Sequence, residues 1–144
     1  MRPLAVLAGL ALYACATDPS PQPPNLGGHW LAQSAGLTVE LDLTNTRCDA
    51  FGSCSGEGAG VWSYSPTGES GSFRVVNYGL LDPRSWGSRG DSVNITMTQL
   101  DPVLMLHFYG KHSSDSFTGT LWQESVTPTA LQGYSAEVAF RRSE

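Results

Sequence analysis

The chain has 144 residues, 40% of them hydrophobic, and a formal net charge of −5. This length corresponds to one domain and excludes a multidomain enzyme. Lys111 is the only lysine and no basic cluster is present, which excludes a protein that binds nucleic acid through its phosphates.

The first segment has the organisation of an export signal. Arg2 precedes an apolar run over 4–12, which has the length of a signal-peptide core and is shorter than the ~20 residues of a transmembrane helix. Leu12-Tyr13-Ala14-Cys15 follows directly and resembles the lipobox of bacterial lipoproteins, with Tyr13 as a departure from the usual small or aliphatic residue. The resemblance implies a signal peptide over 1–14 and a Cys15 that carries diacylglycerol and a fatty acyl chain such as palmitate. Ordinary secretory cleavage after Ala16 is the alternative.

Residues 15–26 form the predicted tether between the lipid and the folded domain. Prolines are so frequent here that neither helix nor sheet is expected, and a polyproline-like spacer would rise ~3.1 Å per residue. The acidic domain will not bind anionic lipid by charge, so the acyl chains would supply the anchoring. The lipoprotein resemblance, with Ala16 rather than Asp after the cysteine, implies the outer membrane as location. A secreted or periplasmic soluble protein is the alternative.

The domain over 27–144 shows a period of two along most of its length. Apolar and polar residues alternate over 37–44, 92–98, 117–121 and 134–141, and β-rich runs cover 28–33, 58–64, 71–78 and 103–109. Short turn sequences separate these runs, which favours antiparallel neighbours. The pattern predicts an all-β fold, an eight-stranded antiparallel up-and-down barrel. A β-sandwich is the alternative.

Short motifs at the two ends of this domain resemble the lipocalin and avidin-like group of barrels. Gly28-His29-Trp30 opens the first strand, and Phe140-Arg141-Arg142 ends the last one. The resemblance implies that Trp30 closes one end of the barrel and that the guanidinium of Arg141 or Arg142 packs on its ring. The alternative is a core tryptophan with two surface arginines.

Two cysteines remain if Cys15 carries lipid. Cys48 and Cys54 lie in a stretch with the look of a hairpin connection between two strands. In an oxidising compartment this pair predicts a disulfide that closes a short loop. Metal or redox chemistry is the alternative, although the C-x5-C spacing is not that of C-x-x-C.

An eight-stranded barrel holds either packed side chains or one small ligand. The side chains that we expect to line its interior are mostly aromatic: Trp62, Tyr64, Phe73, Tyr78, Met105, His107, Phe108 and Trp122. The sequence contains no catalytic constellation and no ligand spacing for a metal. We therefore expect no enzymatic activity, no metal and no cofactor.

Three functions are compatible with this pattern. The first is a lipid-anchored cell-envelope barrel that binds a small apolar or amphipathic ligand. The second is a structural or interaction lipoprotein with a filled core that acts through its loops, with protein partners that the sequence does not identify. The third is a small membrane-spanning barrel, in which the apolar face of each strand would contact lipid.

Overall fold

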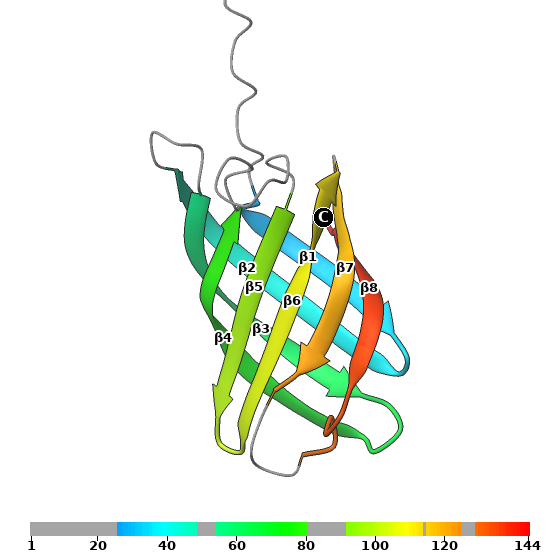
Figure 1. Ribbon diagram of the computed structural model, residues 1–144. Helices are drawn as coiled ribbons and strands as arrows, with labels where there is room; N and C mark the ends of the chain where they lie inside the picture. The colour runs from blue at the N-terminus through cyan, green and yellow to red at the C-terminus, as the bar shows by residue number, and fades with distance from the viewer. Residues whose placement is uncertain (1–25, 49–53, 81–91, 114, 125–128) are drawn as a thin grey trace, which may run out of the picture.

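The fold is a single closed barrel of eight antiparallel strands (Figure 1). The computed structural model describes residues 26–48, 54–80, 92–113, 115–124 and 129–144. The strands are β1 (Gly28–Ser34), β2 (Leu37–Cys48), β3 (Cys54–Tyr64), β4 (Glu69–Leu80), β5 (Ser92–Leu100), β6 (Val103–Ser113), β7 (Ser116–Gln123) and β8 (Ser135–Arg142). The predicted up-and-down barrel is confirmed, and the β-sandwich alternative is wrong. No helix among the described residues could span a membrane.

Each strand pairs with the next one along the chain, and β1 pairs with β8 to close the ring. The closing ladder is short, because only Trp30–Arg142 and Leu31–Arg141 are in register. Beyond them, the Ser34 hydroxyl donates to the Glu137 carbonyl across the same seam, at 3.0 Å. Closure leaves no long sheet edge available for pairing with another chain.

The alternation in the sequence separates the inside of the barrel from the outside. On β2 the apolar residues are Leu37, Val39, Leu41 and Leu43, all at most 3% exposed. The polar residues between them point outward, with their side chains exposed or half-buried. The same separation on the other strands produces one continuous apolar core inside the barrel.

The barrel has two ends of different construction, which we call the termini end and the far end. The described chain begins at Leu26 beside the first residues of β1, and it finishes beside β1 at the same end (Figure 1). The β1–β2, β3–β4 and β5–β6 turns and the β7–β8 connection lie at the far end. The described chain therefore begins at the end of the barrel opposite the tight turns.

The β1–β2 turn at the far end has only two residues. Ala35 and Gly36 both have positive φ, at 48° and 84°, as a two-residue type I′ turn requires. The Gly36 carbonyl accepts a hydrogen bond of 2.9 Å from the Ser65 amide. A side chain at Gly36 would also collide with Pro66, 2.8 Å away. The β1–β2 and β3–β4 turns are consequently packed together.

Candidate functional site

The interior near the termini end is filled by four aromatic rings. Phe117 lies 4.5 Å from Trp30, 5.4 Å from Phe108 and 4.8 Å from Phe140, measured between ring centroids. Phe108 and Phe140 complete the cluster with an edge-to-face contact at 5.3 Å. All four rings are at most 1% exposed. A ring that lined a ligand-sized cavity would retain accessible surface, so this half of the barrel is a packed core.

Trp30 closes this end together with one arginine. Its indole N–H donates to the Leu26 carbonyl at 2.8 Å. The Arg142 guanidinium carbon lies 4.4 Å from the centre of the Trp30 ring, and Arg142 Nη1 donates to the Gly27 carbonyl at 2.7 Å. The side chain of Arg141 is exposed on the outer face instead. Arg142 is therefore the residue that makes the cation–π contact.

The predicted interior lining divides into two groups. Trp62, Phe73 and Phe108 face inward and are 1–5% exposed, and Tyr64 is partly buried against the same core. Tyr78 lies in β4, but its side chain is outside the described residues.

The other part of the prediction is wrong, because Met105, His107 and Trp122 lie on the outside of the barrel. On β6 the buried positions are Leu104, Leu106 and Phe108, so the odd-numbered residues point outward. On β7 Leu121 is buried and its neighbour Trp122 pairs with His107 on the outer face. The prediction selected side chains by their aromatic character. It did not check that the selected residues of each strand lie on the same face.

The interior near the far end contains a hydrogen-bonded polar group that the sequence analysis did not identify. Gln99 is 8% exposed, and its Oε1 accepts from the Trp62 indole N–H at 2.9 Å. Its amide donates to the Pro102 carbonyl at 3.1 Å. The only available signal for this group was the position of the glutamine in β5. It follows Val93, Ile95 and Met97 at the next alternating position, which faces the interior.

The β7–β8 connection covers the same end. Leu131 is 1% exposed and forms part of the core. Tyr134 contacts Tyr64 edge to face at 6.3 Å, and its hydroxyl donates to the Ser34 carbonyl at 2.8 Å. Burial raises the pKa of Tyr134 above its ordinary value, and this outweighs the lowering by the Ser34 side chain.

The predicted cysteine chemistry falls at the edge of the described structure. Cys15 lies outside the described residues. The last residue pair of the β2–β3 ladder is Cys48 and Cys54, directly opposite each other. Opposite residues of antiparallel strands have Cα atoms ~4.5–5.5 Å apart, a separation that a disulfide can span. The disulfide itself stays a prediction.

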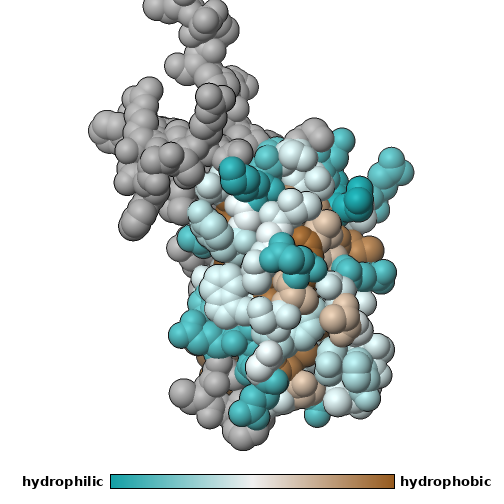
Figure 2. Space-filling model, turned by 45° about the vertical axis from the view of Figure 1, so that its right-hand side comes forward, coloured by the Kyte–Doolittle hydropathy of each residue, from teal (hydrophilic) through white to brown (hydrophobic). Residues whose placement is uncertain are grey.

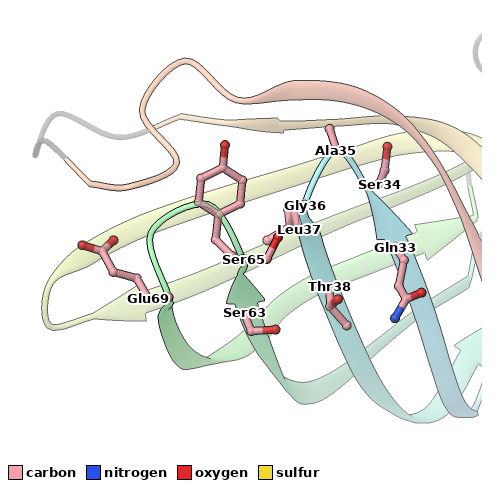
Figure 3. A pocket seen from close by; sticks show the side chains of 11 residues that line it. Gln33, Ser34, Ala35, Gly36, Leu37, Thr38, Ser63, Ser65 and Glu69 are labelled. Atoms are coloured by element: carbon pink, nitrogen blue, oxygen red, sulfur yellow. The ribbon is translucent and has the colours of Figure 1, made fainter.

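A hollow outside the barrel lies between the two far-end turns that pack together (Figure 3). It has a volume of about 510 Å³ and opens to solvent. It is lined by residues of the two turns and the strand ends beside them: Gln33, Ser34, Ala35, Gly36, Leu37, Thr38, Ser63, Tyr64, Ser65, Gly68 and Glu69. A second hollow adjoins it over β2, β3 and β4 and shares Thr38 and Ser63. Both are open hollows on the outer surface, unlike the enclosed pockets that bind apolar ligands.

Two histidines lie on opposite parts of the outer face, each beside a carboxylate. His29 Nδ1 is 2.6 Å from Asp42 Oδ1 on the β1–β2 side. His107 stacks on Trp122 at 5.5 Å, and its Nδ1 lies 3.3 Å from the Thr96 hydroxyl.

His107 Nε2 also lies 3.0 Å from Glu124 Oε2, without the alignment of a hydrogen bond. Among the described residues, no three His, Cys, Asp or Glu side chains converge as metal ligands.

Much of the outer surface is hydrophilic. In Figure 2, hydrophobic residues show only as small, separated areas between hydrophilic ones. A membrane-spanning barrel has the opposite arrangement, with an apolar band outside and a polar lumen. The third function considered from the sequence therefore does not fit the burial pattern.

Comparison with protein-family models, with curated proteins and with solved structures finds no match to this chain.

Proposed function

We propose that this chain is a lipid-anchored cell-envelope protein whose barrel is a solid body that acts through its outer surface. The observation that carries the proposal is the interior aromatic cluster of Trp30, Phe108, Phe117 and Phe140, in which no ring is more than 1% exposed. A barrel that carries a ligand inside needs an enclosed cavity lined by accessible side chains. Here the same volume is occupied by side chains in mutual contact.

The anchoring part of the proposal rests on the sequence before the barrel. The lipobox-like Leu12-Tyr13-Ala14-Cys15 and the proline-rich segment after it are the two parts that a tethered lipoprotein needs. A polyproline-like tether over 15–26 would span roughly 30 Å. It would join the barrel at the termini end, so the far-end turns could reach furthest from the lipid if the barrel stood upright.

The anchoring is tested with the full chain produced in a bacterium that lipidates exported proteins. We expect the wild-type chain in the membrane fraction, with a mass increase on the peptide that begins at Cys15. Cys15→Ser should move the chain to the soluble fraction, whereas the control Cys48→Ser should remain in the membrane fraction. An unmodified soluble chain that begins at Thr17 would contradict the proposal and support ordinary secretion.

The solid interior is tested separately with an apolar fluorescent probe, 1-anilinonaphthalene-8-sulfonate. We expect no saturable binding to the folded chain. Saturable binding of one probe per barrel, displaced by a fatty acid, would overturn the solid-body part and would restore the ligand-binding alternative.

A further inference from the structure

The outer face of β6 differs from a typical solvated strand. Four consecutive outward positions carry Val103, Met105, His107 and Tyr109, which we call the β6 stripe. Val103 is 40% and Tyr109 is 50% exposed, and Leu100, opposite Val103 in the β5–β6 ladder, is 80% exposed. Among the described residues, only one other large hydrophobic residue, Val61 on β3, is classed as exposed. Exposed apolar surface on this barrel is therefore concentrated on one hairpin.

The surroundings of the stripe are mainly uncharged polar residues, with one carboxylate, Glu124, whose Oε2 lies 3.0 Å from His107 Nε2. Thr96 and Thr98 flank it on β5, and Thr118 and Thr120 flank it on β7. Trp122 extends the apolar surface beside His107, with the two rings stacked. Aromatic residues and methionine at the centre with a polar rim are the composition of protein interfaces.

We propose that the β6 stripe is the contact surface between two copies of this chain, packed with their β6 strands antiparallel. Residues equally distant from Leu106 would face each other in such a pair. Met105 of one copy would contact His107 of the other, and Val103 would contact Tyr109. An isologous contact of this kind closes on itself and produces a dimer rather than a fibre.

Charge at the two ends of the stripe selects this orientation. Asp101 precedes the stripe and Lys111 follows it, and both are exposed and equally distant from Leu106. The antiparallel pair places each Asp101 near the Lys111 of the other copy. A parallel pair would place like charges opposite each other, which is unfavourable.

The antiparallel pair is compatible with two lipid anchors in one membrane. Its two-fold axis crosses both β6 strands at right angles and is oblique to the barrel axes, because the strands of a barrel are tilted. If this axis lies along the membrane normal, the termini ends of both barrels lie at the same height and both tethers can reach the same surface. The inference goes beyond the proposed function and does not depend on the anchor itself.

The size of the stripe predicts a weak association. Nine residues of strand span ~30 Å, and three strands span ~10 Å between the outer two axes. A footprint of this size is at the low end for specific interfaces, so we expect a dissociation constant in the micromolar range. Confinement to a membrane would raise the effective concentration of both copies.

The experiment is sedimentation equilibrium on the full-length chain with Cys15→Ser, over a hundredfold range of protein concentration. We expect a monomer–dimer equilibrium that Tyr109→Glu and Val103→Glu each weaken at least tenfold. Val61→Glu is the matched control, because Val61 is 48% exposed on β3 and should not change the equilibrium. Circular dichroism checks that each variant is folded.

Charge reversal tests the orientation. Asp101→Lys and Lys111→Asp should each weaken the dimer, and the double variant should restore it. A monomer at all concentrations would overturn the proposal, as would a dimer that the two stripe variants leave unchanged or that Val61→Glu weakens equally. A double variant that stays as weak as the single ones would overturn the antiparallel arrangement.

Discussion

The two ends of the barrel are closed by different kinds of interaction. At the termini end, rings of Trp30, Phe108, Phe117 and Phe140 fill the interior and Arg142 covers the indole. At the far end, apolar core residues such as Leu131 share the interior with two hydrogen bonds, from Trp62 to Gln99 and from Tyr134 to the Ser34 carbonyl. Aromatic packing tolerates small displacements, whereas a buried donor without its acceptor is costly. The far end therefore depends on a few specific atoms, and the termini end depends on filled volume.

The largest expected effect is at the termini end. Phe108→Ala removes a fully buried ring from the centre of the aromatic cluster and should lower the free energy of unfolding by about 3–5 kcal/mol. The neighbouring His107→Ala is the matched control, because this side chain lies on the outer face, and we expect about 1 kcal/mol or less. Urea denaturation measures both. Equal losses would contradict the inward and outward assignment on β6.

The corresponding change at the far end removes hydrogen bonds with little change of volume. Gln99→Leu leaves the Trp62 indole N–H and the Pro102 carbonyl without their partner, and should cost about 1–3 kcal/mol. Gln33→Leu, on the exposed face, is the control and should have a much smaller effect. Urea midpoints of the two variants within error of each other would show that the bond to Trp62 does not stabilise the far end.

Arg142 provides a smaller test of the termini end. Arg142→Ala removes the cation–π contact with Trp30 and the hydrogen bond to Gly27, and should lower stability by about 1–2 kcal/mol. Arg141→Ala, one residue away on the outer face, should be close to neutral. The intrinsic tryptophan fluorescence spectrum, to which Trp30 contributes, should change only in the first variant. A larger loss with Arg141→Ala would contradict the assignment of Arg142.

A gain of stability is expected at the β1–β2 turn of the far end. Ala35 has φ 48°, a region in which an L-residue other than Asn, Asp or Gly is disfavoured. Ala35→Gly should therefore raise the free energy of unfolding by about 0.5–1 kcal/mol, because the relief of left-handed strain exceeds the entropy that glycine adds to the unfolded chain. Gly36→Ala should do the opposite, because it combines positive φ with a collision at Pro66. Thermal melting distinguishes the two signs, and destabilisation by Ala35→Gly would refute the strain argument.

Tyr134 should make the folding stability depend on pH in the alkaline range, with no effect at neutral pH. Burial raises the pKa of its hydroxyl above the ordinary 10.0. Above about pH 10 the unfolded chain releases this proton while the folded chain retains it, so stability should fall with rising pH until the folded pKa is passed. Tyr134→Phe should make the alkaline part of the pH–stability curve flatter. A curve unchanged by Tyr134→Phe would place the cause elsewhere.

The strand pattern was predictable because it depends on local alternation. Leu37, Val39, Leu41 and Leu43 repeat every second residue, and a period of two can bury only one face of a strand. Short turns between eight such segments leave few topologies besides a meander that closes on itself. The wrong assignment of Met105, His107 and Trp122 was avoidable in principle, since their parity opposes that of Leu106 and Leu121.

Contacts between distant segments were decided by the tertiary structure. The alternation places Arg142 rather than Arg141 on the same face as Phe140, but the contact of Arg142 with Trp30 depends on how β8 meets β1 at the closing seam. The partner of Gln99 is Trp62, 37 residues earlier, and only the barrel brings them together. The filled interior follows from the relative positions of Trp30, Phe108, Phe117 and Phe140 in four strands. The sequence determined which face of each strand is buried, and the closed ring of strands determined which side chains meet there.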